Sequence, residues 1–379
     1  MITTQHLSEN DFAALRPEWN DLLARSRNPG PMLTWEWMFS WWEAYRASDV
    51  ARTLYLLAAR LPDGRLAGLA PFVLRSASRH GLRFRRLEFM GTGEAEQDET
   101  CSEYLDWIVD VAHEEACVEA FARAVLGDAG WDEILCRDVR TDRPSSVARF
   151  CDAAARTAGV GVEEFGAARC PFIPLPPSWG AYLDGLSRNG RRLVRYKRKQ
   201  LLAAERVEFR SVRTGEEILK VYDRFTELHQ VRWSAQEKDG CFASGTFSRF
   251  LRSVTERLAA AGGAQVALLS ANGEVIAIYL LLRRGANLYY YNSGMAAGPY
   301  DEHSPGSVCL GYIIEHAIRD GDREIHLFKG GTNSYKYHWT DSAVPVASFR
   351  IVRRGIRWAI CRILDGIRRG ARRAARGLR

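Results

Sequence analysis

The segment NLYYYNSG (287–294) leads into the loop HSPGS (303–307), and EIHLFKGG (324–331) follows one helix length later. The apolar pattern predicts a strand over 286–294, a helix over about 306–320 and a second strand over 323–328. A strand that feeds a small-residue loop at a helix N-terminus makes an anion site, because unpaired backbone N–H groups and the helix dipole point at the ligand. Gly306 and Ser307 would let a phosphate approach closely. The alternative is ordinary capping, with Ser304 as the cap and Pro305 in the first turn.

Around this segment, helical and extended patterns alternate along the chain. Apolar spacings of three and four predict helices near 10–26, 35–47, 113–126, 145–158, 188–206, 215–233 and 247–261. Apolar runs bounded by turn residues predict strands at 53–60, 66–74, 82–90, 104–110, 132–139, 264–270, 274–284 and 346–353. This order favours mixed α/β or α+β architecture over an all-helical or all-β fold.

Two features divide the chain of 379 residues. The stretch CPFIPLPPSWG (170–180) holds four prolines, and proline continues neither a helix nor a central strand. A hairpin turn at Asp63-Gly64 in the first half is matched by one at Asn272-Gly273 in the second, each followed by a strand, a helix and a strand. We therefore predict a duplicated unit, with domains at 1–170 and 171–353 and a separate tail at 354–379.

The positive charge of the chain lies in its tail. The formal net charge is +7, but residues 353–379 contain ten arginines and one aspartate, so the rest of the chain is close to neutral. Val352, Ile356, Ile360, Ile363 and Ile367 follow a helical spacing beside these arginines. This pattern is typical of a basic amphipathic helix that docks on anionic lipid or on a partner, and packing of the tail on the body is the alternative.

Cysteine and histidine spacing argues against metal and disulfide scaffolds. The eight cysteines are scattered singly with no C-x-x-C pair, and no two histidines have the spacing of metal ligands, so we expect a reducing compartment and no metal. The N-terminus has no signal-peptide pattern, and the longest apolar runs, such as 275–282, are far shorter than a membrane span. The prediction is a cytoplasmic protein, with peripheral membrane association through the tail left open.

The end of the second half carries the most specific motif. Gly331, Tyr335, Lys336 and Trp339 form the pattern G-x-x-x-Y-K-x-x-W directly after the strand that follows the Pro-Gly loop. With the preceding hairpin, strand, loop and helix, this order resembles the tandem-domain branch of the GNAT acyltransferase superfamily. Its relatives include the FemAB-like proteins and the CelD/BcsL-type proteins associated with bacterial cellulose and exopolysaccharide biosynthesis.

The resemblance implies two tandem GNAT-like domains, each a mixed, mostly antiparallel sheet flanked by helices, of the α+β class. It implies an N-acyltransferase that moves an acyl group from acyl-CoA, with acetyl-CoA as the first candidate, to an amine of a small molecule or glycan precursor. A strand amide would polarise the thioester carbonyl. The implied donor-binding residues are Tyr291, Asn292, Ser293, Ser304, Gly306 and Ser307.

Candidate catalytic and acceptor residues surround this motif. Tyr335 is placed to protonate the leaving thiolate, and Lys336 to contact phosphate or carboxylate. His229, at the end of a long helix, is a candidate base or an ordinary surface histidine. The remaining candidates, for substrate contact, are Arg232, Trp233 and Trp339.

Two departures from the resemblance keep other functions open. The strand before the motif reads IHLF (325–328) where relatives often carry an acid, and the glycine-rich phosphate loop is reduced to SPGS (304–307). FemAB-like relatives that take aminoacyl groups from tRNA share the fold, and residues 188–199 carry seven cations and no acid, which suits RNA phosphates or a solvated face. A third alternative is a degenerate module that binds a synthase complex or a membrane through the tail.

The first half contributes acidic residues rather than a phosphate loop. Its corresponding helix begins with Glu114 and Glu115, which would repel a pyrophosphate, so we expect only the second half to bind the donor. An acidic segment precedes that helix and either recognises a cationic acceptor across the domain interface or is a solvated loop. Its members are Glu94, Glu96, Asp98, Glu99 and Glu103.

Overall fold

The computed structural model describes residues 2–46, 52–234, 237, 239–298, 300–331 and 334–377, with side chains described as far as Ile367. One sheet of thirteen strands runs through this part of the chain in the order β1-β2-β3-β4-β6-β13-β7-β12-β11-β10-β9-β8, with β5 paired to β3. The strands are β1 (Thr3–Leu7), β2 (Arg52–Arg60), β3 (Leu66–Arg79), β4 (Leu82–Phe89), β5 (Ile108–Val109), β6 (Glu133–Arg140), β7 (Val160–Pro174), β8 (Val207–Val212), β9 (Ala264–Ala271), β10 (Glu274–Arg284), β11 (Asn287–Met295), β12 (Glu324–His326) and β13 (Ala343–Arg353).

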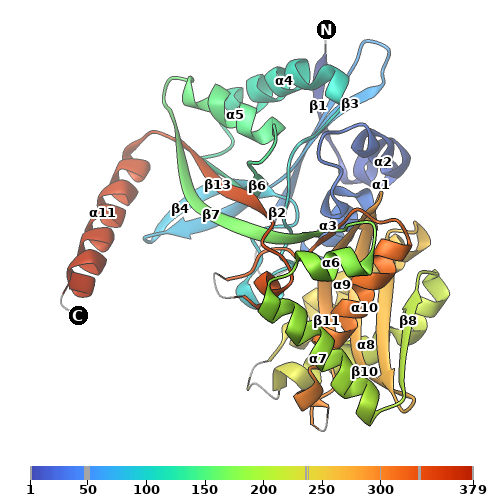
Figure 1. The fold of residues 1–379 in the computed structure, drawn as a ribbon. Helices are drawn as coiled ribbons and strands as arrows, with labels where there is room; N and C mark the ends of the chain where they lie inside the picture. The colour runs from blue at the N-terminus through green and yellow to red at the C-terminus, as the bar shows by residue number, and fades with distance from the viewer. Residues whose placement is uncertain are drawn as a thin grey trace.

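Helices flank the sheet, as Figure 1 shows. They are α1 (Glu9–Ala14), α2 (Arg16–Ala24), α3 (Trp35–Tyr45), α4 (Glu114–Gly127), α5 (Ser146–Ala155), α6 (Trp179–Gly185), α7 (Arg188–Ala204), α8 (Gly215–Ser234), α9 (Gly245–Ala260), α10 (Pro305–Arg319) and α11 (Ile356–Gly377). No helix in the described part of the chain is both long enough and apolar enough to cross a membrane.

The same strand order occurs in both halves. The units β2-β3-β4-α4-β6 and β9-β10-β11-α10-β12 each contain two antiparallel hairpin-linked pairs and then a parallel pair across the helix, β4 with β6 and β11 with β12. The turns at Gly64 (φ +86°) and Gly273 (φ +88°) use the left-handed conformation that glycine adopts without steric cost. The predicted mixed, mostly antiparallel α+β architecture is confirmed.

Two central strands join these units. β13 pairs with β6 on one side and with β7 on the other, and the last residues of β7 pair with β12. β7 therefore crosses from one unit to the other, as the long green strand of Figure 1 shows. The expectation that the proline stretch interrupts strand structure is wrong for its first part. Pro171 lies within β7, and its carbonyl accepts a hydrogen bond from the Leu327 N–H (2.9 Å). Proline can make this bond because it lacks only the backbone N–H, not the carbonyl.

Several elements were not predicted from the sequence, including the longest strand, β7. β1, β8, β7 and α6 were not expected, and the strand expected at 104–110 is reduced to Ile108–Val109. β1 and β8 lie at the two edges of the sheet, and most of their residues are not buried. Pairing with the neighbouring strands, rather than an apolar pattern in their own sequence, therefore holds them in place.

The aromatic helix α3 forms the contact between the halves. Trp37 and Trp41 are fully buried, and the Trp37 ring meets Phe250 of α9 edge to face at 5.1 Å. Trp37 also contacts the ring of Tyr291 in β11 at 5.2 Å. The tryptophans therefore pack in the core of the protein.

Candidate functional site

β11 loses one of its two neighbouring strands, β12, after the first third of its length. It pairs with β12 only from Asn287 to Tyr289 and then continues to Met295, whereas the chain after His326 turns toward β7. The pairing of β11 with β10 passes from Asn292–Leu280 to Tyr290–Leu281, which leaves Tyr291 as a bulged residue. A bulge re-aims backbone groups locally and is common beside active sites. The structure thus places a bulged backbone beside an opening between two diverging strands.

Packing against α8 fixes the position of this strand. A Cβ built on Gly294 would lie 2.6 Å from the His229 backbone nitrogen and 2.8 Å from Leu228 Cβ, so the strand and helix backbones touch here. This close approach requires glycine. It brings Arg232 and Trp233, at the end of α8, beside the open part of β11.

A cavity of about 450 Å³ lies at the N-terminus of α10. Ser304 precedes the helix in a left-handed conformation (φ 52°, ψ 61°), and its side chain makes no capping bond. The capping alternative for Ser304 is therefore wrong, although Pro305 does occupy the first turn. The N–H groups of the first turn are consequently not satisfied by Ser304, which suits an anion. We call this cavity the helix pocket; it is lined by Arg232, Tyr279, Met295, Ala296, Ala297, Asp301, Ser304, Pro305, Gly306, Ser307 and Tyr335.

The expected close approach of a phosphate to Gly306 meets an obstacle. A Cβ built on Gly306 would lie 2.5 Å from Met295 Cε, so the methionine methyl group occupies the space over this glycine. Methionine side chains are flexible and change rotamer readily. The Asp301 carboxylate, which accepts the Gly298 N–H (3.1 Å), also lines the pocket. A phosphate therefore requires movement of Met295 and binding away from Asp301.

A chain of hydroxyl groups begins at Tyr335, which lines this pocket, and leads away from it. The Tyr335 hydroxyl donates to the Tyr290 hydroxyl at 3.2 Å, and Tyr290 and Ser293 share a hydrogen bond of 2.7 Å. Burial of the hydroxyl end and the adjacent Tyr290 raise the pKa of Tyr335, although part of its ring is exposed. Tyr335 therefore holds its proton at neutral pH and can present it to an anion in a hydrogen bond.

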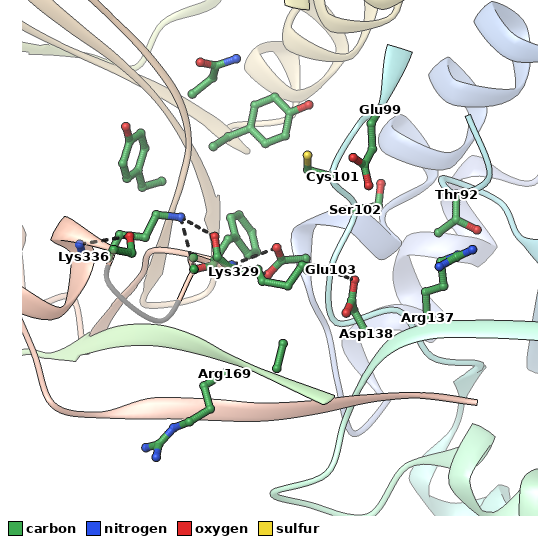
Figure 2. Close-up of a pocket in the computed structure, with 18 of the residues that line it drawn as sticks. Thr92, Glu99, Cys101, Ser102, Glu103, Arg137, Asp138, Arg169, Lys329 and Lys336 are labelled. Carbon is green, nitrogen blue, oxygen red and sulfur yellow. Dashed lines mark hydrogen bonds and ion pairs between the residues drawn. The ribbon is translucent and has the colours of Figure 1, made fainter. Parts of the chain in front are cut away.

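A larger cleft of about 1500 Å³ lies between the two halves. Figure 2 shows Glu99, Cys101, Ser102 and Glu103 from the first half on one side and Lys336 from the second half on the other. Arg232 and Tyr335 line both this cleft and the helix pocket, so the two cavities meet at these side chains. The charged residues that line the cleft are Glu94, Glu96, Glu99, Glu103, Arg137, Asp138, Arg169, Arg232, Lys329, Lys336 and Asp341.

Glu103 is the most constrained carboxylate of the cleft. Its side chain accepts the Lys329 backbone N–H at 2.9 and 2.8 Å and the Cys170 thiol at 3.1 Å, and the residue is only 5% exposed. Burial outweighs these hydrogen bonds and raises the pKa of Glu103 to about 7. Glu103 therefore changes its protonation state near neutral pH, as a general base should.

The acidic segment is only in part a solvated loop. Glu94 accepts hydrogen bonds from the Trp41 indole and from Thr100 Oγ1, and burial raises the pKa of Glu94. Asp98 does not line the cleft and accepts the Ser244 hydroxyl instead. The solvated-loop alternative is thus wrong for Glu94 and Glu103, which are held in the cleft wall.

Lys336 lines the cleft but is bound to the protein itself. Its Nζ donates to the carbonyls of Lys329 (2.8 Å) and Phe328 (3.3 Å), and burial lowers the pKa of Lys336. The Lys336 side chain thereby supports the loop after β12. It does not line the helix pocket where a phosphate would lie.

His229 and Trp339 lie apart from both cavities. His229 is 3% exposed, accepts the Trp233 indole N–H at Nε2 (2.9 Å) and lies 3.3 Å from Gln230 Oε1 through Nδ1. Burial lowers the pKa of His229 to about 4, so the ring is neutral. Trp339 is 4% exposed, and its carbonyl accepts the Tyr182 hydroxyl (2.8 Å). Both residues are therefore buried and line neither cavity.

The other residues expected at the site divide between the two cavities. Tyr291, Asn292, Ser293, Trp233 and Lys336 line the cleft, and Ser304, Gly306 and Ser307 line the helix pocket. The Tyr291 ring packs on Trp37 and its hydroxyl donates to the Thr100 carbonyl (3.0 Å), so only its backbone remains for a ligand. Thr332 and Asn333 of the G-x-x-x-Y-K-x-x-W motif lie outside the described residues.

Sequence reasoning missed the role of several residues. Tyr290 stands in a conspicuous run of three tyrosines, but the pattern does not show which ring faces the site. Cys101, Asp138 and Phe328 line the cleft with φ values of 51°, 49° and 56°, a left-handed conformation that is rare outside glycine. Such strained residues often cluster at functional sites, and no sequence signal marks them.

The described residues contain no group of three or more His, Cys, Asp or Glu side chains placed to hold a metal ion. All eight cysteines are free. Desolvation of the thiol group in the cleft wall, together with the neighbouring Glu99 and Glu103, raises the pKa of Cys101 to about 12, so this thiol stays protonated at neutral pH. A thiolate nucleophile is therefore not favoured here.

Part of this chain is similar to a known family, and its fold is similar to solved structures. Residues 188–337 match the family model described as an acetyltransferase (GNAT) domain, and no curated protein matches the chain. The solved structure of FemX is 12% identical and covers 92% of this chain and 96% of its own, with a TM-score of 0.58.

Two further solved structures are similar over the whole chain. A conserved protein of unknown function from Bacteroides thetaiotaomicron is 12% identical, covers 93% of this chain and 100% of its own, and has a TM-score of 0.54. A C-terminal domain (DUF2156) assigned to a lysylphosphatidylglycerol synthetase of Agrobacterium fabrum is 12% identical over 93% of this chain and 95% of its own, with a TM-score of 0.51. At such identity the likeness shows the fold alone. The expected GNAT-like organisation is thus confirmed at the level of the fold.

Proposed function

We propose that this chain, whose C-terminal half is similar to GNAT acetyltransferase domains, transfers an acyl group from acyl-CoA to an amine. One observation carries the proposal. Two cavities, one at a helix N-terminus and one with an acidic wall, meet at Arg232 and the protonated hydroxyl of Tyr335. The first suits the phosphates of a donor, and the second suits a cationic amine.

The donor would extend from the helix pocket along the open edge of β11. Its phosphates would accept from the N–H groups of Gly306 and Ser307, and its thioester would lie near the bulge at Tyr291. A backbone N–H aimed at the thioester oxygen stabilises the oxyanion that forms during attack. Acetyl-CoA is the first donor to test, since the matched family model is an acetyltransferase domain.

Acyl transfer needs one proton acceptor and one proton donor. The cationic amine first loses one proton to solvent, because only the neutral amine has a lone pair for attack. We assign Glu103 as the group that accepts the second proton as the nitrogen attacks, because its pKa of about 7 leaves it partly ionised at neutral pH. The amine nitrogen forms a bond to the acyl carbon, and the carbon–sulfur bond breaks. To protonate the thiolate, the Tyr335 hydroxyl turns from Tyr290 toward the sulfur. Tyr290 and then Ser293 pass a proton back to Tyr335, and solvent in the cleft supplies that proton.

A titration with acetyl-CoA tests the donor assignment. Saturating ligand at about 100 times its Kd should stabilise the native state by about 2.7 kcal/mol. Ser307→Asp keeps the helix stable, because an acid in the first turn is favoured by the dipole, yet it repels phosphate. We expect the thermal shift and the release of free CoA to be lost in Ser307→Asp and kept in Ser307→Ala. If acetyl-CoA gave the same thermal shift with Ser307→Asp as with Ser307→Ala, the donor would not bind in the helix pocket.

An aminoacyl-tRNA donor is the second candidate, and one surface favours it. The α7 face that carries Arg188, Arg192, Arg195 and Lys199 is exposed, and these side chains form no ion pair with the described residues. The spacing of four, three and four residues aligns the four charges along the helix. α7 also packs on α10, whose N-terminus forms the helix pocket. A polyanion along α7 would therefore reach the same site.

Filter binding of bulk tRNA separates the two donors. Binding that weakens steeply with salt and falls at least about tenfold in Arg192→Glu/Arg195→Glu supports the tRNA donor. Lys220→Glu, on α8, is the matched control. Turnover with acetyl-CoA and no tRNA binding would decide for acyl-CoA, and inactivity with both donors would support a degenerate binding module. An amine of a cell-envelope or exopolysaccharide precursor is the acceptor class we propose to screen first.

A further inference from the structure

α11 is attached to the body along one side only. The Asp365 carboxylate contacts His80 Nε2 at 2.7 Å and the Arg79 guanidinium, at the turn between β3 and β4. Burial alone would raise the pKa of Asp365, but these contacts lower it, so the carboxylate stays charged at neutral pH. Cys361 is fully buried against the same turn. Figure 1 shows the helix standing apart from the rest of the body beyond this contact.

The opposite side of α11 is an exposed row of isoleucines. Ile356 is 82% exposed, Ile360 40%, Ile363 64% and Ile367 62%. Steps of four, three and four residues place these side chains on one face, about 16 Å long. Cys361 and Asp365 lie on the face toward the body, so the isoleucine row points away from it. Single exposed apolar residues are common, whereas an aligned row marks an interaction surface.

Charge indicates what covers this row. Residues 353–379 contain ten arginines and one aspartate, and the flanking Arg357 and Arg362 are exposed. A second copy of the helix would bring the same positive charge against the row and repel it. An anionic lipid surface would attract the arginines, and its apolar interior would bury the isoleucines.

We propose that α11 docks the protein on an anionic lipid surface, with Ile356, Ile360, Ile363 and Ile367 inserted among the acyl chains and the arginines on the headgroups. The contact at Arg79 and His80 holds the helix so that the row faces outward. The sequence also allowed the tail to pack on the body. The four isoleucines do not do so, because they are exposed. This inference concerns where the protein acts and is independent of the acyl-transfer proposal.

Vesicle sedimentation of the full chain tests the inference. Vesicles of phosphatidylcholine with about a third phosphatidylglycerol should bind the protein, and pure phosphatidylcholine should bind it far less. Raising the salt from about 0.1 M to about 1 M, which shortens the Debye length from about 10 Å to about 3 Å, should weaken binding. Ile363→Asp/Ile367→Asp should lower the partition coefficient at least about tenfold. Leu219→Asp, at an exposed leucine of α8, is the matched control and should bind as the wild type does.

Three results would overturn the proposal. The first is equal binding of the wild type and the Ile363→Asp/Ile367→Asp variant to anionic vesicles. The second is no binding of the wild type to either vesicle. The third is a wild-type dimer in solution that becomes monomeric in the same variant, which would assign the row to a second copy. Ile363→Leu/Ile367→Leu should retain binding, and melting curves of all variants show whether the body remains folded.

Discussion

Glu103→Gln should remove a pH dependence of stability that the buried carboxylate imposes. The pKa of Glu103 rises from 4.5 to about 7 on folding because the side chain is buried. Between these values the folded state holds more protons than the unfolded state, so stability falls as pH rises. The loss is complete only above about pH 7. A rise of this size in the pKa of Glu103 corresponds to about 3 kcal/mol in total.

Urea unfolding from about pH 5 to about pH 8 measures this effect. Over that range the Glu103→Gln variant should gain about 2–3 kcal/mol relative to the wild type, because glutamine has no proton to lose. The amide also changes the bonds to the Lys329 N–H, but this offset is the same at every pH. The slope of the difference, rather than its size at one pH, is therefore diagnostic.

Glu99→Gln is the matched control, since Glu99 lines the same cleft but is exposed. It should leave the wild-type slope unchanged. Parallel stability curves for the wild type and Glu103→Gln would refute the reasoning about burial. In the acyl-transfer assay, kcat/KM of the wild type should rise through about pH 7 and that of Glu103→Gln should be low and flat. A full rise in the variant would exclude Glu103 as the base.

Four other substitutions test the packing and the chemistry. Gly294→Ala should destabilise the protein by about 1–3 kcal/mol in urea unfolding, because the new Cβ meets the α8 backbone. The control Gly311→Ala lies within α10 at ordinary contact distances and should stabilise the protein by about 0.5–1 kcal/mol. Equal effects of the two substitutions would contradict the close approach of β11 to α8. Tyr335→Phe should lower kcat about 100-fold or more with little change in KM for the donor, and an unchanged kcat would remove Tyr335 as the proton donor. Glu88→Ala should cost about 3–5 kcal/mol in the same unfolding assay, since the buried carboxylate pairs with Arg75 at 2.6 and 3.0 Å; a loss below about 1 kcal/mol would show that this ion pair contributes little.

Local patterns in the sequence determined the elements that surround the helix pocket. The glycines at 64 and 273 specify tight turns, and apolar runs on either side specify the paired strands. The strand, Pro-Gly loop, helix and strand of the second half follow from the same short-range signals. These features rest on contacts between residues near in sequence, so periodicity and turn residues suffice to predict them.

Only the tertiary structure decided the central strands and the cleft. β7 has little strand pattern of its own and exists because β13 and β12 pair with it from distant parts of the chain. Glu103 looks like a residue of a solvated loop until the Lys329 N–H from the other half binds its carboxylate. The same holds for His229, for which the sequence allowed a base or an ordinary surface histidine, whereas the structure buries it in contact with Trp233. Burial and long-range pairing set the protonation state and the access of these side chains, and no local pattern records either.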